Sequence, residues 1–386
     1  MPEGKETRKD EFFIVAGETS GEQYGALLAA ELRKLRPGCA VTGVGGDAMK
    51  EEGVDLLHHV KDLAVVGLTD VLARIRTLKA VFENVVQEIL DRRPAALVLI
   101  DYPGFNLRLA KRIHGSGIPI VYYISPQIWA WHRNRVHDIG RTCDKILVVF
   151  DFEVDLYAGE GYEAIYVGHP LLDRMRMHEI RDLRAELNIP EGKRIIGLLP
   201  GSRKQEIERL LPVYLQAAEL LVSNEVADLE FHLALAPLAD RKTVESMLAS
   251  HDLPVKMFAN RSYDVMASSD LLFVASGTAT LEAAVLGTPM IVTYKTGAIT
   301  YLVGKSVLNV DWLALPNIIA NAEIVPELLQ DNLKPEYLAA LSANLLSDEE
   351  AYEEMKASLA AVRARLGGPG ASARAAAEVV KAAGLA

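Results

Sequence analysis

The sequence predicts an α/β protein built from two doubly wound parallel sheets in series. Short apolar runs alternate with stretches of helical periodicity, as in residues 12–17 (FFIVAG) followed by residues 22–35. This alternation is typical of βαβ units with a parallel sheet. The same rhythm restarts at residues 194–200 (RIIGLLP), and 386 residues suffice for two domains with separate cores.

The expected elements follow one another in the same way through both halves. The predicted strands cover residues 12–17, 96–101, 118–125, 145–150, 194–200, 230–237, 270–276 and 289–295. A polar stretch at residues 174–193 separates the two series, so the boundary is expected near residues 170–190. From about Pro335 onward the pattern is helical and rich in alanine.

Composition excludes several classes of protein. The formal net charge of −11 argues against a general nucleic-acid binder, which needs clustered Lys and Arg. Cys39 and Cys143 are the only cysteines and have no partners at metal-ligand spacing, which favours a reducing compartment. The first residues lack the apolar stretch of a signal peptide, and no apolar run approaches a membrane span. We therefore expect a cytoplasmic protein.

The first candidate site is the turn of Gly201, Ser202 and Arg203 between a buried strand and a helix. Free N–H groups and the positive end of the dipole make such a turn suitable for an anion. Plain helix capping explains the same residues equally well. The GxxxxGK[ST] pattern is absent, so ATP hydrolysis is not indicated. Within the following helix, Pro212 is expected to cause a kink or a restart.

A second turn in the same half has similar chemistry. Ser276, Gly277 and Thr278 supply hydroxyl and backbone donors where a strand passes into a helix, and Glu282 lies one turn further on. An acidic side chain near a helix start stabilises the dipole by a few tenths of a kcal/mol. It could also accept both hydroxyls of a ribose. Two helix starts that converge on one anion are a stronger signal than either alone.

Candidate acidic groups also lie in the first half. Asp101 ends a strand that is expected to be fully buried, and Glu18 lies in the first Gly-rich turn. The residues alone favour Asp101 as a helix cap by roughly two to one. If Asp101 faces a ligand, its carboxylate can take a proton from an attacking hydroxyl, and Glu18 is the competing candidate.

An aromatic and basic cluster follows a strand of the first half. Trp129, His132 and Arg135 belong to it, and they could recognise a phosphate on an amphipathic ligand or simply pack. Residues 63–82 combine apolar side chains with Arg and Lys as an interfacial helix does, although a buried amphipathic helix explains that segment better. His169 is expected to be a turn or hinge residue, because no second metal ligand lies at suitable spacing.

The ordered set of motifs resembles lipid-A-disaccharide synthase, a glycosyltransferase family. The matching stretches are AGETSGE, GVGGDAM, LAVVGLTDVL, IDYPGFN, YYISPQIWAWHRNR, VGHPLLD, LLPGSRKQEI, SGTATLEAAVLGTPM, LPNIIA and VPELLQ, which cover roughly residues 12–330. The resemblance implies a GT-B fold of two doubly wound domains facing a central cleft. It places an acceptor domain at residues 1–170, a UDP-sugar domain at residues 171–365, and a final helix, 366–386, back on the first domain.

The resemblance also implies a reaction. An inverting transfer from UDP-2,3-diacylglucosamine to 2,3-diacylglucosamine 1-phosphate (lipid X) would give lipid A disaccharide 1-phosphate and UDP, without a cofactor or metal. The enzyme would work as a peripheral protein at the cytoplasmic face of the inner membrane and could form a homodimer. Its expected site residues are Asp101 as the general base with Glu18 nearby, Gly201, Ser202, Arg203, Ser276, Gly277, Thr278 and Glu282 for UDP, and Asn317, Trp129 and Arg135 for the sugars or the acceptor.

Five positions depart from the residues usual in the family: Glu22, Val66, Asp70, His132 and Ala322. Among them, His132 and Ala322 each replace a fixed positive charge, which affects how a phosphate would be held. Two other functions share parts of the pattern. A UDP-N-acetylglucosamine 2-epimerase or a transferase with a soluble acceptor would not need residues 63–82, and a non-catalytic UDP-sugar sensor would not need Asp101.

Overall fold

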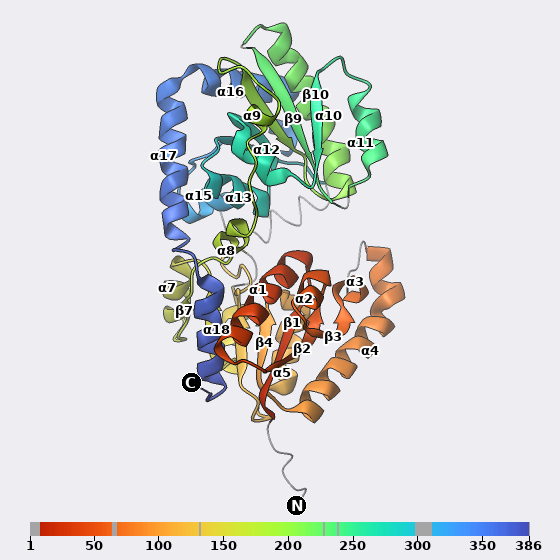
Figure 1. The fold of residues 1–386 in the computed structure, drawn as a ribbon, viewed down its shortest axis with the longest axis vertical. Helices are drawn as coiled ribbons and strands as arrows, with labels where there is room; N and C mark the ends of the chain where they lie inside the picture. Colours follow the sequence, from red (N-terminus) through yellow and green to blue (C-terminus); the bar gives the residue numbers. More distant parts are fainter. Residues whose placement is uncertain are drawn as a thin grey trace, which may run out of the picture. The chain divides into compact units, whose positions relative to one another are not determined.

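The computed structural model describes residues 8–63, 68–130, 133–226, 228–237, 239–297 and 311–385. The chain divides into two compact units (Figure 1). The first unit comprises Met1–His178 together with Leu366–Ala386, and the second comprises Glu179–Arg365. The chain therefore passes into the second unit shortly after the boundary expected at residues 170 and 171, and its last residues belong to the first unit.

The first unit is a seven-stranded parallel sheet with helices. Its strands are β1 (Arg8–Ala16), β2 (Ala40–Gly45), β3 (Asp55–His59), β4 (Pro94–Ile100), β5 (Ile120–Tyr123), β6 (Lys145–Val148) and β7 (Ile165–Tyr166). Its helices are α1 (Thr19–Leu35), α2 (Asp47–Glu51), α3 (Val60–Leu63), α4 (Leu68–Arg92), α5 (Pro103–Ile113), α6 (Arg135–Thr142), α7 (Phe152–Ala158), α8 (Leu171–Arg176) and α18 (Ala371–Ala382).

Both faces of the first sheet are covered. Side chains alternate between the faces of a strand, and Phe13 and Val15 of β1 join the core formed with α4 and α5. Helices α1 and α18 contact each other and the sheet, α18 lying against β4 and β5. Asp173 fixes the start of α18, because its carboxylate accepts the backbone N–H groups of Gly370 and Ser372. Burial on both faces explains the unbroken apolar strands of the sequence.

The second unit repeats the design with six parallel strands. They are β8 (Arg194–Leu199), β9 (Leu229–Leu235), β10 (Val255–Ala259), β11 (Leu271–Ala275), β12 (Met290–Tyr294) and β13 (Glu327–Leu329). Its helices are α9 (Leu183–Glu186), α10 (Lys204–Ser223), α11 (Arg241–Leu248), α12 (Ser262–Ser268), α13 (Thr278–Leu286), α15 (Leu315–Ala320), α16 (Pro335–Ser347) and α17 (Glu349–Arg365), with a 3₁₀ turn, η1 (Gln330–Asn332). The two doubly wound sheets predicted from the sequence are confirmed.

The restart of the helix that was one of the two outcomes expected at Pro212 is wrong. Helix α10 runs from Lys204 to Ser223 with Pro212 inside it. Proline removes one backbone hydrogen bond from a helix. Leu211 and Tyr214, on either side of Pro212, are fully buried, and this packing stabilises the helix around the proline.

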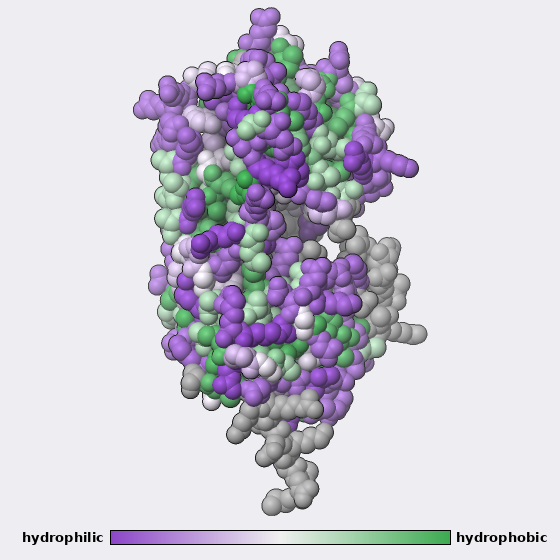
Figure 2. All heavy atoms as spheres, viewed as in Figure 1, coloured by the Kyte–Doolittle hydropathy of each residue, from purple (hydrophilic) through white to green (hydrophobic). Residues whose placement is uncertain are grey.

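The surface of each unit is mostly polar on the face drawn in Figure 2, with apolar side chains scattered between. Among the described residues, the large apolar side chains that are exposed are Leu35, Met177, Ile180, Val222 and Tyr337. Among the helices that the structure describes, none is long and apolar enough to cross a membrane.

Candidate functional site

The first candidate site lies where the winding of the first sheet reverses. Its strand order, β3-β2-β1-β4-β5-β6-β7, makes β1 and β4 neighbours, with Ala16 opposite Ile100. The chain winds outward from β1 in one direction and from β4 in the other, and ligands of such sheets bind beyond the carboxyl ends at this point. Glu18 follows β1 and Asp101 follows β4, so the sheet brings these two sequence-predicted residues together.

The backbone at Asp101 is strained and firmly held. Asp101 and Tyr102 have φ angles of 42° and 47°, in the left-handed region that such residues rarely adopt. The Asp101 carbonyl accepts hydrogen bonds from Tyr122 Oη (2.7 Å) and Asn106 Nδ2 (2.8 Å). Tyr102, and not Asp101, is the N-cap residue of α5, and no side chain caps that helix. The capping role that the residues alone favoured for Asp101 is therefore wrong.

Tyr102 also ties the two loops together. A Cβ atom on Gly17, in the loop after β1, would lie only 2.0 Å from Cδ1 of Tyr102. Only glycine permits this contact, because no other residue lacks a Cβ atom. The loop that carries Glu18 is thereby packed against the loop that carries Asp101.

The Asp101 carboxyl is in an unusual electrostatic environment. Burial, followed by the nearby charge of Glu18, raises its pKa from 3.8 to about 7, while the Tyr102 N–H and the charge of Arg135 act in the opposite direction. Arg135 is the first residue of α6 and is half-buried. Glu18 is exposed and is the N-cap residue of α1, without a hydrogen bond from its side chain to the helix. A carboxyl that titrates near neutral pH can serve as a general base.

Trp129, from the loop after β5, is tied to an acid that the sequence analysis did not identify. Its Nε1 donates to Oε1 of Glu153 at 3.2 Å, and its ring packs edge-on against Phe150 and Phe152. Glu153 is 1% exposed. In the sequence it is only an acidic residue in the first turn of a helix, a common position that carries no distinguishing signal.

The second candidate site lies at the corresponding point of the second sheet. The order β10-β9-β8-β11-β12-β13 makes β8 and β11 neighbours, with Leu199 opposite Val274. This is again where the winding direction reverses. The turn of Gly201–Arg203 follows β8, and the turn of Ser276–Thr278 follows β11, so both predicted anion-binding turns lie at one edge of one sheet.

The first of these turns already holds an anionic group, the carboxylate of Glu206. Its Oε2 accepts the backbone N–H groups of Ser202 and Arg203, each at 3.2 Å, and Arg203 Nη1 donates to Oε1 at 2.8 Å. Gly201 has φ 103°, and a Cβ there would lie 2.4 Å from Glu206 Oε2. The Arg203 side chain is 82% exposed. The three-residue spacing from Arg203 to Glu206, as in a capping box, was a readable signal for this contact.

The second turn is open at its tip. Gly277 and Thr278 are exposed, and Gly277 has φ 147°. Ser276 is partly engaged, since its Oγ donates to the Leu313 carbonyl at 3.1 Å. Glu282, in the second turn of α13, accepts a hydrogen bond from Tyr263 Oη at 3.1 Å.

Asn317 has a structural role in place of the sugar-lining role that the resemblance implies. Its side chain is fully buried. Its Nδ2 donates to the Val325 carbonyl and to Glu327, and its Oδ1 accepts the N–H groups of Ile324 and Val325. With these bonds made, Asn317 holds the segment that leads into β13 and has no exposed atom for a sugar.

Other expected residues fall at different places. Val81, from the segment 63–82, is buried in the first unit's core, while Lys79 is exposed. The side chains at residues 62–77, with Asp70 among them, lie outside the described part, as do Val66 and His132. Ala322 is exposed.

His169 is a buried turn residue, as expected. It is 7% exposed, and its Nδ1 accepts the backbone N–H of Leu171 at 3.1 Å. Burial, assisted by the charge of Arg174, lowers its pKa from 6.5 to about 3. In the described part of the chain, no group of three or more His, Cys, Asp or Glu residues could hold a metal ion.

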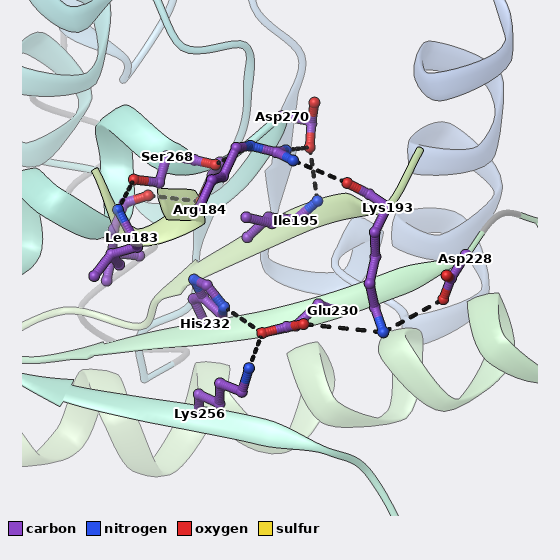
Figure 3. Close-up of polar contacts among 12 residues, drawn as sticks. Leu183, Arg184, Lys193, Ile195, Asp228, Glu230, His232, Lys256, Ser268 and Asp270 are labelled. Carbon is purple, nitrogen blue, oxygen red and sulfur yellow. Dashed lines mark hydrogen bonds and ion pairs between the residues drawn. The ribbon is translucent and has the colours of Figure 1, made fainter. Parts of the chain in front are cut away.

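A polar network that the sequence analysis did not identify lies at the opposite, amino-terminal edge of the second sheet (Figure 3). Asp270 accepts hydrogen bonds from Arg184 of α9 and from the N–H of Ile195. Glu230 is paired with Lys256 and with the buried His232. This edge is remote from the carboxyl ends of the strands, and the pair of Arg184 and Asp270 links α9 to the sheet.

Comparison with known proteins identifies the family of the chain. The family model described as lipid-A-disaccharide synthetase matches residues 12–379. Lipid-A-disaccharide synthase from Anaeromyxobacter sp. (strain K) is 42% identical over 372 residues, covering 96% of this chain and 97% of the relative. The enzyme of that name from Geobacter sulfurreducens is 41% identical, covering 97% of this chain and 98% of its own.

Solved structures share the fold at low sequence identity. A UDP-GlcNAc 2-epimerase from Neisseria meningitidis bound to UDP-GlcNAc has a TM-score of 0.67 at 15% identity, covering 96% of this chain and 100% of that chain. MurG from Acinetobacter baumannii has a TM-score of 0.58 at 13% identity, covering 96% and 99%. These likenesses show the two-domain GT-B fold. Together with the match over nearly the whole length, they lead to one conclusion: this chain belongs to the lipid-A-disaccharide synthase family, glycosyltransferases of lipid A biosynthesis.

Proposed function

We propose that this enzyme transfers 2,3-diacylglucosamine from its UDP conjugate to the 6-hydroxyl of 2,3-diacylglucosamine 1-phosphate (lipid X), with inversion at the anomeric carbon. The products are the β-1,6-linked disaccharide 1-phosphate and UDP. The observation that carries the proposal is that each unit places its candidate groups at the switch point of its own sheet, in a chain of this family.

In the second unit, the proposed donor end uses the two turns after β8 and β11. The Arg203 guanidinium has donors beyond the one it gives to Glu206, and a guanidinium suits a diphosphate. The exposed Gly277 and Thr278 supply further donors, and Glu282 would accept the ribose hydroxyls. Positive charge at the leaving diphosphate lowers the barrier to departure of UDP.

In the first unit, the proposed acceptor end uses Asp101 as the general base. Its ionised carboxylate takes the proton of the acceptor 6-hydroxyl while that oxygen attacks the anomeric carbon. The bond from this carbon to the UDP oxygen breaks, and UDP leaves with the electron pair. Trp129 and Arg135 would contact the acceptor sugar or its phosphate, and Glu18 would line the same site.

The substrates set the place of work. Both carry acyl chains, so we propose that the enzyme acts as a peripheral protein at the cytoplasmic face of the inner membrane. The exposed apolar side chains of the described part are scattered, which is compatible with loose contact between the enzyme and the membrane surface.

The test is an assay of UDP release by the purified protein with both acylated substrates. UDP formation that needs both substrates, with a disaccharide 1-phosphate as the second product, is the expected result. Arg203→Ala should weaken UDP binding by about tenfold or more, the loss of one charge-assisted contact. Absence of UDP release above background with authentic substrates would contradict the proposal.

A further inference from the structure

Glu153 is a buried acid without a cationic partner among the described residues. It is 1% exposed and lies in the first turn of α7. Every hydrogen bond given to its carboxylate comes from a neutral donor. Trp129 Nε1 donates to Oε1 at 3.2 Å, and the N–H groups of Val149 and Phe150 donate to Oε2 at 3.3 and 3.1 Å. Burying such an acid costs stability, and its three hydrogen bonds offset part of this cost.

The partners of Glu153 come from two loops at the proposed acceptor end. Trp129 lies in the loop after β5, and Val149 and Phe150 form the turn after β6. Strand β5 lies between β4 and β6 in the sheet. The loops that follow these three strands therefore leave the same edge next to one another, and the loop after β4 begins with Asp101.

Backbone bonds continue the connection to Asp101. The Asp101 N–H donates to the Ile124 carbonyl at 3.2 Å, and the Ile124 N–H donates to the Leu147 carbonyl at 3.0 Å. The ends of β4, β5 and β6 are thus bonded in sequence. Glu153 adds the only side-chain bridge from the Trp129 indole to the turn after β6 among the described hydrogen bonds.

We propose that Glu153 is a positioning residue for the acceptor end of the reaction proposed above: it fixes the Trp129 indole, and with it the loop after β5, beside Asp101. The inference rests on the proposed function for its kinetic consequence. The hydrogen bond that Trp129 donates to Glu153, and its response to the charge on Asp101, can be measured without activity.

The electrostatics agree with this geometry. Burial, followed by the charge of Asp101, raises the pKa of Glu153 to about 8 against the effect of its three N–H donors. Tyr157 also senses the Glu153 charge, and Glu18 and Arg135 act on Asp101. The ionised carboxylate accepts all three donors, whereas a protonated one gives up one lone pair. Ionisation of Glu153 should therefore strengthen its bond to Trp129.

The first experiment is a kinetic double-mutant cycle on the full chain. Glu153→Gln keeps the size of the side chain but turns an NH₂ group toward donors, and Trp129→Phe removes the indole N–H. Above pH 8, where Glu153 is ionised, each should raise KM for the acceptor about tenfold, about one charge-assisted hydrogen bond, without changing KM for the donor. The double variant should be no worse than the poorer single variant. Asp155→Asn, exposed on the same helix, is the matched control.

The second experiment needs neither turnover nor a Glu153 variant. The chain has three tryptophans, so selective ¹⁵N labelling gives three indole N–H signals at most, and Trp129→Phe identifies the relevant one. Its chemical shift should titrate with a midpoint near pH 8, the pKa of Glu153. In Asp101→Asn the midpoint should move to lower pH, because a negative neighbour is gone.

The outcomes separate the two proposals. Additive effects in the double variant, or a Trp129 signal whose midpoint is unmoved in Asp101→Asn, would overturn the role of Glu153. If the indole signal titrates as expected but no transfer is observed with the acylated substrates, the bridge stands and the proposed function fails.

Discussion

Asp101 combines strained backbone, burial and like charge at one residue, and this combination sets its expected pH behaviour. Its pKa is raised to about 7, so the base is ionised above and protonated below this pH. The rate constant kcat/KM for the UDP-sugar donor should therefore rise with pH through a midpoint near 7 and level off above it. An Asp with the ordinary pKa of 3.8 would give no such limb between pH 6 and 8. Asp101→Asn should remove the limb and lower kcat by about 100-fold.

Replacement of Glu18 tests which of the two acids, Asp101 or Glu18, is the general base. Its charge is the second cause of the raised pKa of Asp101, after burial. Glu18→Gln should move the midpoint of the kcat/KM limb to lower pH while a large part of the activity remains. Arg135→Gln should move it to higher pH, because a favourable positive charge is lost. Loss of activity in Glu18→Gln equal to that in Asp101→Asn would assign the base to Glu18.

Burial of His169 should make the folded protein less stable in acid. Its pKa in the folded protein is about 3, below the ordinary value of 6.5, so the unfolded chain takes up the proton first. The free energy of unfolding is unaffected by this group above about pH 6.5. It falls by about 1.4 kcal/mol per pH unit as the pH drops from there toward 3. In His169→Gln, the oxygen of the side-chain amide can still accept the Leu171 N–H, and the amide takes up no proton in this pH range.

The measurement is urea denaturation of the wild type and His169→Gln between pH 7.5 and 4.5. The denaturation midpoint of the wild type should fall more steeply with decreasing pH than that of the variant. His114→Gln, at an exposed position, is the control and should follow the wild type. Parallel curves for the wild type and His169→Gln would contradict the assignment.

At the scale of elements, strands and their ends were predictable, and side-chain partners distant in sequence were not. The unbroken apolar runs that ended at Asp101 and before Gly201 located both switch-point edges, because burial on two faces leaves a clear signal. The role of Asn317 depends on the segment at residues 324–327, which folds against it from a distance in sequence. Burial of Glu153 depends likewise on the loop after β5. No local pattern encodes such contacts.

Arg184 is one of the residues that hold the short helix α9 on the second unit, beside the ion pair of Glu186 with Arg261. Arg184 donates to Asp270, to the Ser268 carbonyl at 3.2 Å and to the Lys193 carbonyl at 3.0 Å (Figure 3). Its side chain is 27% exposed, and that of Asp270 is 15% exposed. Arg184→Ala should lower the free energy of unfolding of this unit by about 3 kcal/mol, as expected when a largely buried pair loses one partner.

The matched control is Arg194→Ala, which removes the second arginine on Asp270. This side chain is 46% exposed and makes one bond of 3.1 Å, so its loss should cost less than about 1 kcal/mol. Guanidinium denaturation, followed by a spectroscopic signal from the second unit, measures the free energy of unfolding of both variants. Equal losses would show that α9 is held by its other contacts and not by Arg184.

At the scale of the whole molecule, the first unit is built from both ends of the chain. The first unit is completed only by Leu366–Ala386, whose helix α18 buries Ala375, Ala376 and Val379 against it. The second unit is one continuous segment, Glu179–Arg365, with helices of its own on the sheet. A chain that ends at Arg365 should therefore expose an apolar face of the first unit and lose transfer activity through instability or aggregation.

The same division predicts that residues 179–365 fold alone and bind UDP. The segment has its own buried core, and all of the proposed UDP contacts, from Gly201 to Glu282, lie within it. Calorimetric titration should give a UDP dissociation constant within about tenfold of that of the full chain, and Arg203→Ala should weaken it in both. A folded segment that does not bind UDP, beside a full chain that does, would mean that the first unit supplies part of the nucleotide site.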